Sequence, residues 1–227
     1  MEEGGVERAL LISDAYLEEG AERFRLNEEL SAFVAGAPGR YRGLCGLNTA
    51  WSDGDEVLER CLALPGMIGI KLHFRWFHQS LSSPETAARF ESLASIADGR
   101  RGTFLIHMNL EKDAAGELSA LREVARRHPR SRFVIAHAAE SALDALAASG
   151  GVENLYTEVS TFVIRDPSEV SAALRGFGIG RVLFGVDGPG YGSKRTIERF
   201  LALPLTDAAK TAVLETNGAA FWESLPR

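Results

Sequence analysis

Seven short apolar runs alternate with longer amphipathic stretches along this chain, and this alternation restricts the fold more than any other feature. Short β-rich runs that are apolar on both faces predict buried strands of a parallel sheet. The predicted strands are Ala9–Ser13, Tyr41–Leu47, Ile68–His73, Thr103–His107, Arg132–His137, Leu155–Ser160 and Arg181–Asp187. The predicted helices between and after them are Asn27–Ala35, Asp53–Leu62, Pro84–Ala97, Gly116–His128, Ser141–Ala148, Ser168–Leu174, Lys194–Leu203 and Asp207–Glu215. The pattern predicts an α/β fold of βαβ units, which is typical of a (β/α) barrel.

The number of strands is one short of a closed barrel, which has eight. The last run is followed by enough helical sequence to complete a barrel, so we expect the missing strand at the front of the chain. A length of 227 residues suits one domain, and we predict a single barrel domain over residues 1–227.

Composition and charge exclude several classes of protein. The formal net charge of −6 argues against a nucleic-acid partner, which would need a basic face. No run approaches the roughly 20 apolar residues of a membrane helix, and no signal sequence precedes Ala9, so we expect a cytoplasmic protein without a membrane partner. Cys45 and Cys61 predict no disulfide framework, and Cys45 is expected to be a small core residue.

Four of the apolar runs end in a residue that can bind a metal or move a proton, namely His73, His107, His137 and Asp187. A single histidine at a strand end is usually a hydrogen-bonded core residue. In a (β/α) barrel, however, the active site lies at the carboxyl ends of the strands, so four such residues together favour one converging site. Imidazoles and a carboxylate are common ligands of a divalent metal, and Asp187 is alternatively the base that takes a proton from water.

Lys71 and the loop after His73 are candidate substrate-binding residues. Lys71 and His73 lie on the same face of their strand. Lys71 is therefore expected to point into the barrel, one layer of side chains below His73. Arg75 has the planar donor geometry to bind a carboxylate, and Trp76 can pack against an apolar or aromatic group. The alternatives are a local polar pair for Lys71 and a simple covering of the barrel top by the aromatic rings.

Other carboxylates and amides follow the same strands. Glu158 lies within a predicted strand, so it must be paired or lie in the barrel mouth. The candidate partners that orient the histidine rings are Asn109 and Glu111 after His107, Glu140 after His137, and Glu158 with Ser160.

An ordered set of segments resembles a known family. The segments are Gly5–Leu11, Gly69–His73, Leu105–His107, Val134–His137, Asn154–Tyr156 and Leu183–Pro189. They resemble the amidohydrolase-related branch of the amidohydrolase superfamily, which includes aminocarboxymuconate-semialdehyde-decarboxylase-like enzymes. The resemblance implies a barrel with one metal ion, with His107 and Asp187 as ligands and His137 as the residue that orients or protonates the substrate.

The chain departs from this family in its histidines. The family's first strand carries a His-x-His pair, whereas the five histidines of this chain, at positions 73, 78, 107, 128 and 137, include no such pair. The fourth-strand histidine is usually followed by proline, and here Phe74 follows His73. Either the chain begins at an internal methionine, or it is naturally short and has abandoned or rebuilt the metal site. A rebuilt site of three ligands, His73, His107 and Asp187, is chemically possible. A lost first strand would leave two unpaired edges, which we expect a homo-oligomer to cover.

We therefore predict an enzyme of the amidohydrolase type with one divalent metal, zinc. It is expected to hydrolyse a C–N or C–O bond, or to decarboxylate a small carboxylated substrate, which Arg75 suggests is anionic. The alternatives are a non-catalytic barrel that binds or scaffolds, and a metal-free lyase or isomerase that uses the same residues as acid and base.

Overall fold

The computed structural model describes residues 4–111, 113–137, 152–160, 166, 168–188 and 192–226. Its strands are β1 (Ala9–Ile12), β2 (Tyr41–Gly46), β3 (Met67–His73), β4 (Thr103–His107), β5 (Arg132–Ala136), β6 (Leu155–Val159) and β7 (Val182–Phe184). Its helices are α1 (Gly20–Ala35), α2 (Gly54–Ala63), α3 (Pro84–Gly99), α4 (Ala114–Arg127), α7 (Ser168–Phe177), α8 (Ser193–Leu201), α9 (Asp207–Thr211) and α10 (Asn217–Ser224). Two short 3-10 helices, η2 (Asp14–Leu17) and η3 (Ile179–Arg181), and a π-helical segment η4 (Ala212–Thr216) between α9 and α10 complete them. The helix predicted over Ser141–Ala148 lies outside the described residues.

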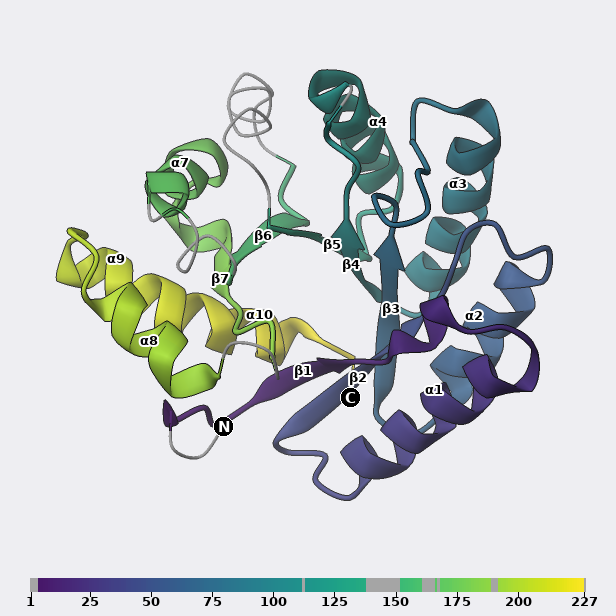
Figure 1. The fold of residues 1–227 in the computed structure, drawn as a ribbon, viewed down its shortest axis with the longest axis horizontal. Helices are drawn as coiled ribbons and strands as arrows, with labels where there is room; N and C mark the ends of the chain where they lie inside the picture. Colours follow the sequence, from purple (N-terminus) through teal and green to yellow (C-terminus); the bar gives the residue numbers. More distant parts are fainter. Residues whose placement is uncertain are drawn as a thin grey trace.

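The seven strands form one parallel sheet in the order of the sequence, β1 to β7. The sheet curls into a partial barrel with the helices around it (Figure 1). Among the described residues no pairing joins β1 to β7, so the barrel is open between these two strands. The prediction of an incomplete (β/α) barrel with seven strands is confirmed.

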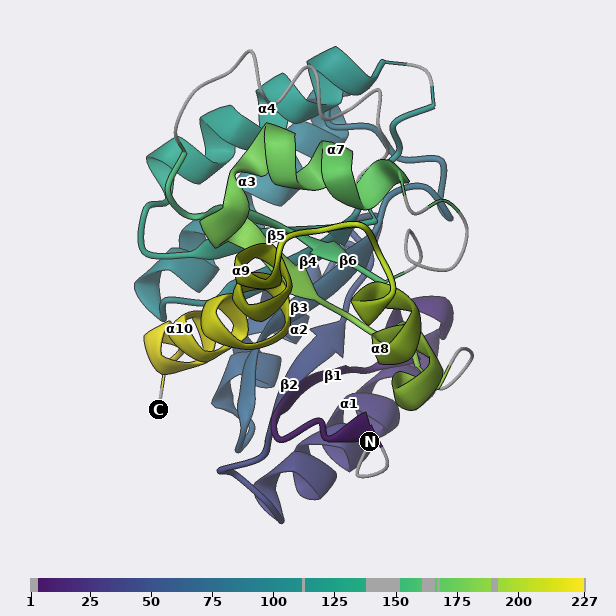
Figure 2. The ribbon, with the colours of Figure 1, turned by 90° about the vertical axis from the view of Figure 1, so that its left-hand side faces the viewer.

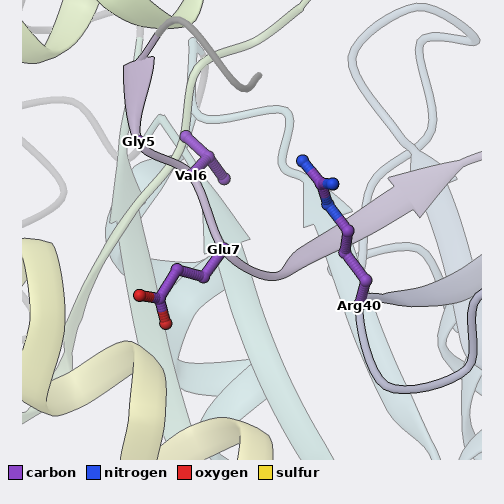
Figure 3. A pocket seen from close by; sticks show the side chains of 4 residues that line it. All are labelled: Gly5, Val6, Glu7 and Arg40. Atoms are coloured by element: carbon purple, nitrogen blue, oxygen red, sulfur yellow. The ribbon is translucent and has the colours of Figure 1, made fainter.

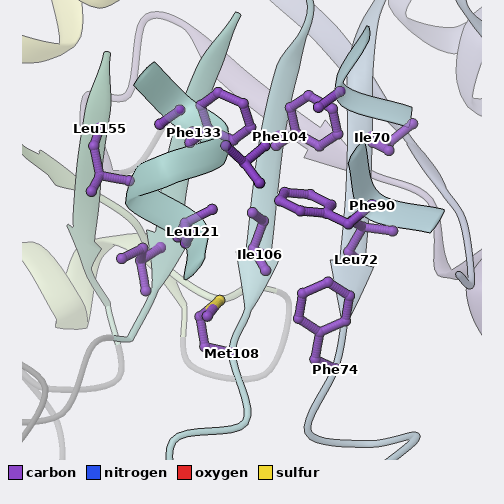
Figure 4. Close-up of a cluster of buried hydrophobic side chains, with 14 of the residues drawn as sticks. Ile70, Leu72, Phe74, Phe90, Phe104, Ile106, Met108, Leu121, Phe133 and Leu155 are labelled. Carbon is purple, nitrogen blue, oxygen red and sulfur yellow. The ribbon is translucent and has the colours of Figure 1, made fainter. Parts of the chain in front are cut away.

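The main hydrophobic core lies between the sheet and the outer helices. Ile70, Leu72, Phe104 and Ile106 alternate along their strands and pack outward, against helix residues such as Phe90 (Figure 4). Figure 2 shows α3, α4 and α7 on this outer side of the strands. Because one face of each strand is used in this way, the alternate residues of the same strands point into the barrel.

A second, smaller core fills the inside of the barrel. The inward residues Leu44, Ile68, Val134 and Leu183 pack with Phe221 and Leu225 of the C-terminal segment. In Figure 1 the yellow α10 lies between β7 and β1. The C-terminal helix therefore supplies side chains to the interior of the barrel that its seven strands leave open.

Two predictions about the elements are wrong. The first helix begins at Gly20, whereas Asn27, its predicted first residue, lies within it. Its side chain is buried and bridges the backbone of Gly46, accepting from the N–H at 3.0 Å and donating to the carbonyl at 3.4 Å. The Asn27 amide thus satisfies the buried backbone hydrogen-bonding groups at the end of β2. This contact depends on how α1 packs against the sheet, which the local sequence pattern does not encode.

The cysteines are the second correction. Cys45 on β2 and Cys61 on α2 form a disulfide, whose Cα atoms are 6.3 Å apart. Both residues are buried in the outer core, as expected of Cys45, but the prediction that they form no disulfide is wrong. Two cysteines 16 positions apart give no framework pattern in the sequence, and only the packing of α2 against β3, the neighbour of β2, brings them together.

Among the described residues, each helix is too short or too polar to span a membrane.

Candidate active site

His73 and His107 end two neighbouring strands and face each other directly. They are register partners in the β3–β4 pair, and their rings stack with centroids 4.0 Å apart and planes 15° apart. Burial lowers the pKa of His107 to about 2 and that of His73 to about 4, and the positive charge of Lys71 adds to both effects. Both imidazoles are therefore neutral near pH 7, which is the form that binds a metal.

His137 and Asp187 follow the ends of β5 and β7, and both have an unusual backbone. Each has a φ of 50°, in the left-handed region that residues other than glycine adopt at a cost of roughly 1–3 kcal/mol. The His137 ring lies edge-on to the His107 ring at 5.3 Å, and its Nε2 is 3.9 Å from Asp187 Oδ1. The two residues with this strained backbone, His137 and Asp187, therefore bring their side chains together in the barrel mouth.

Glu158 and Ser160, both on the inward face of β6 and its end, hold His137. Glu158 Oε1 lies 2.6 Å from His137 Nδ1 and accepts the backbone N–H of His137 at 3.1 Å. Ser160 Oγ lies 2.9 Å from the same Nδ1. Burial alone would lower the pKa of His137, but the charge and hydrogen bond of Glu158 outweigh it and raise that pKa. Glu158 is therefore both paired and in the barrel mouth, which agrees with the prediction.

Lys71 lies on the inward face of β3, because its neighbours Ile70 and Leu72 pack in the outer core. It is only 5% exposed. Burial lowers the pKa of its amine to about 8, and the negative charges of Glu158, Asp187 and Asp14 offset part of that effect. The lysine is therefore a buried cation that faces the carboxylates of the mouth.

The loops after β3 and β4 form a rim above these residues. Arg75 donates to Glu111 at 2.6 Å, and both side chains are more than half exposed. Trp76 is 64% exposed, and its ring lies 5.9 Å from that of His73. The backbone N–H of Trp76 donates to His73 Nδ1 at 3.1 Å. Asn109 donates to the carbonyl of Gln79 at 3.1 Å, so it ties the two loops together. Glu140 lies outside the described residues.

Sequence reasoning missed two residues of the mouth, Asp14 and Tyr16, which lie on η2 directly after β1. The Tyr16 ring is 5.9 Å from His73 and 6.5 Å from Phe77, and its hydroxyl donates to Asp14 at 3.2 Å. Burial and the charge of Asp14 raise the pKa of Tyr16 to about 12. Asp14 and Tyr16 directly follow the first apolar run, and all strand ends of a parallel barrel meet at one edge. Their position in the sequence could therefore have identified them as site residues.

The donor types of this mouth suit a divalent ion, but their arrangement is only partly that of a metal site. Within the described ranges no three His, Cys, Asp or Glu side chains are grouped to hold an ion. Ligand nitrogens direct their lone pairs in the ring plane, so two nearly parallel rings 4.0 Å apart do not point at one ion. His73 Nδ1 also accepts a hydrogen bond, which places the proton of the neutral ring on Nε2.

A pocket at the other end of β1 contains none of the predicted site residues. Gly5, Val6, Glu7 and Arg40 line it (Figure 3). It lies before the first residue of β1, whereas the histidines lie at the carboxyl ends of the strands.

Comparisons with known proteins agree with this fold. The sequence profile of the amidohydrolase family matches residues 7–223. No protein in the search of curated proteins matches.

Solved structures share the fold at low sequence identity. The 2,6-dihydroxybenzoate decarboxylase from Rhizobium has a TM-score of 0.73 at 14% identity, over 98% of this chain and 86% of that one. The dihydroxybenzoic acid decarboxylase from Polaromonas, solved with manganese and 2-nitroresorcinol, has a TM-score of 0.69 at 17% identity, over 98% and 83%. A TIM-barrel protein from Bordetella bronchiseptica has a TM-score of 0.74 at 16% identity, over 99% and 80%.

Because the family profile spans nearly all of the chain, the protein belongs to the amidohydrolase family of enzymes.

Proposed function

We propose that this protein is a metal-dependent enzyme that decarboxylates a small aromatic carboxylate at the mouth of its open barrel. The observation that carries the proposal is the convergence of His107, His137 and Asp187 at three strand ends, with the His137 Nε2 facing Asp187 at 3.9 Å. Family membership supports an enzyme, and two structures with this fold are decarboxylases of dihydroxybenzoates. Hydrolysis of a C–N or C–O bond is the second candidate, because the family profile is that of amidohydrolases.

His107 and Asp187 are the residues that we propose hold the divalent ion. His107 offers a neutral imidazole, and Asp187 offers a carboxylate at the same mouth. When bound, such an ion acts as a Lewis acid that polarises a carboxylate or carbonyl oxygen. The Polaromonas structure contains manganese, so manganese is a candidate beside the zinc that the sequence predicts. His73 as a third ligand stays a prediction, since its ring would have to turn away from its present hydrogen bond with Trp76.

We propose that His137 moves the proton in the reaction. In decarboxylation the bond between the ring carbon and the carboxylate breaks, its electron pair stays on that carbon, and carbon dioxide leaves. The carbon then needs one proton, which the protonated His137 Nε2 is placed to donate. The pKa of His137 is raised, mainly by Glu158, so the ring carries that proton more readily than an ordinary histidine.

We propose that Lys71, Arg75 and Trp76 bind the substrate. Lys71 is a buried cation at the floor of the mouth, and Arg75 is an exposed cation at its rim. Both attract a carboxylate, and the exposed Trp76 ring beside His73 offers a flat surface for an aromatic ring. A single domain, a homo-oligomeric state, a cytoplasmic location and the lack of nucleic-acid or membrane partners remain predictions.

The test is the release of carbon dioxide from 2,6-dihydroxybenzoate and related aromatic carboxylates, in the presence of Mn²⁺ or Zn²⁺. Asp187→Asn and His137→Gln are expected to lower kcat by about 100-fold or more, as the loss of a general acid or a ligand does. His78→Gln, on an exposed loop, is the matched histidine control and is expected to keep full activity.

Turnover that survives both site variants would contradict the proposal. Turnover that is unchanged by EDTA would favour the metal-free lyase, and hydrolysis of an amide or ester without any decarboxylation would favour the hydrolase. A folded protein that binds no metal and turns over no substrate would favour the non-catalytic barrel.

A further inference from the structure

We propose that Glu158 is a positioning residue that fixes the tautomer and the orientation of His137, with Gly185 leaving the room it needs. Its catalytic consequence rests on the proposed function of His137, but the positioning itself can be tested without any substrate.

Glu158 contacts His137 at two points, which a merely local ion pair would not do. One oxygen, Oε1, lies 2.6 Å from the ring Nδ1 and accepts the backbone N–H at 3.1 Å. Ala136 and Glu158 are register partners in the β5–β6 pair, so the sheet itself sets the position of the carboxylate. Both the ring and the backbone of a residue with a φ of 50° are thereby held from one side.

This contact favours a proton on Nδ1, the ring nitrogen that Ser160 Oγ also approaches to 2.9 Å. A carboxylate oxygen accepts hydrogen bonds, so it favours the tautomer with a proton on Nδ1. The lone pair of the neutral ring then lies on Nε2, which faces Asp187 and the mouth. A carboxylate that orients a catalytic imidazole in this way is a recurring device in enzymes.

Gly185, on the neighbouring strand end, makes the arrangement possible. A β-carbon at this position would overlap Glu158 Oε2 and approach Ser160 Cβ to 3.2 Å. Gly185 does not have a left-handed φ, so the backbone conformation does not require glycine here. What requires glycine is the lack of room for a β-carbon. This explains a glycine two residues before Asp187 that a strand position does not otherwise require.

The experiment measures the tautomer of His137 directly, with long-range ¹H–¹⁵N correlation spectra of the EDTA-treated protein at pH 9. The spectrum of His137→Gln identifies the signals of this ring. The variants are Glu158→Gln, which keeps an oxygen acceptor, and Glu158→Met, which has none. Thr157→Val is the matched control, because it removes a buried hydrogen bond of the same strand, from Thr157 Oγ1 to the Ile135 carbonyl, on the opposite face.

We expect the proton on Nδ1 in the wild type, in Thr157→Val and in Glu158→Gln. In Glu158→Met and in Gly185→Ala we expect the ring to move largely to the tautomer with the proton on Nε2. A wild-type ring with its proton on Nε2, or a Glu158→Met ring that keeps the wild-type tautomer while the protein stays folded, would overturn the proposal.

Kinetics then separate this inference from the proposed function. If the reaction is as proposed, Glu158→Met lowers kcat by about 100-fold with little change in KM, and Glu158→Gln lowers it by about tenfold or less. A tautomer change without any loss of kcat leaves the positioning role intact and contradicts the proposed role of His137.

Discussion

The stability of the protein is expected to fall as the pH falls below about 6.5, because His73 and His107 are buried in their neutral form. Burial depresses their folded pKa values to about 4 and about 2, below the 6.5 of an unfolded histidine. As the pH falls below 6.5, the unfolded chain takes up these two protons first, so the free energy of unfolding decreases. Urea unfolding in EDTA between pH 7 and 4.5 is the measurement. His107→Asn is expected to reduce the slope of the free energy of unfolding against pH by nearly one proton, and an unchanged slope in that variant would contradict the assignment.

The polar residues at the strand ends were predictable from the sequence, but their contacts were only partly so. A histidine or aspartate after an apolar run is visible in the sequence, and the topology of a parallel barrel brings such residues to one edge. Glu158 and Ser160 were predicted as candidate partners of a histidine ring, but only the fold shows that the ring is that of His137. Tyr16 and Asp14 were missed because their place beside His73 depends on how η2 turns after β1.

Asn27→Ala is expected to destabilise the protein by about 1–3 kcal/mol, because it removes both hydrogen bonds to the buried backbone of Gly46. Glu29→Ala, on the same helix with an exposed side chain, is the control and is expected to change stability by about 0.5 kcal/mol or less. Urea midpoints give both values. Equal effects of the two substitutions would show that the Asn27 bridge contributes nothing.

At the scale of elements, the strands were predicted well and the helix starts less well. Strand starts agreed to within one residue because buried parallel strands are continuous apolar runs, whereas strand ends extended up to three residues too far, as at Asp187. The predicted start of α3 at Pro84 is correct, since proline fits the first turn of a helix. The predicted helix start at Asn27 was wrong, because the sequence does not distinguish a buried asparagine inside a helix from one that begins a helix. The disulfide between β2 and α2 could not be predicted, because it depends on how a helix packs on the sheet.

Loss of the disulfide is expected to lower the free energy of unfolding by about 3 kcal/mol, the entropy of a loop of this length in the unfolded chain. Cys45→Ala with Cys61→Ala is compared with the oxidised wild type by urea unfolding, and with the wild type unfolded and refolded in a reductant. A reduced wild type as stable as the oxidised protein would contradict the stabilising role of the bond.

At the scale of the whole molecule, the order of seven strands was predictable and the closing of the barrel interior was not. The alternation of runs predicts each βαβ unit, so the parallel order β1 to β7 follows from the sequence. The contribution of Phe221 and Leu225 to the interior does not follow, because the last helix predicted from the sequence ends at Glu215, before α10 begins. The candidate site lies at the mouth of a barrel in which, among the described residues, the edge strands β1 and β7 do not pair with each other.

Backbone amides of β1 and β7 are expected to exchange with solvent faster than those of the central strands β3, β4 and β5, since edge strands lack one neighbour. Hydrogen–deuterium exchange with mass spectrometry at several protein concentrations is the measurement. Protection of β1 and β7 that rises with concentration would support the predicted homo-oligomer. Edge strands protected as strongly as β4 at the lowest concentration would contradict an open barrel.

We have proposed that His107 and Asp187 hold one divalent ion at the mouth of the barrel, and metal titration measures this binding without any substrate. Mn²⁺ and Zn²⁺ are titrated calorimetrically into the EDTA-treated protein and into His107→Ala, Asp187→Asn and His78→Gln. We predict one ion per chain in the wild type and in His78→Gln, and at least tenfold weaker binding in the other two variants. Binding of unchanged affinity and stoichiometry in both His107→Ala and Asp187→Asn would contradict the claim.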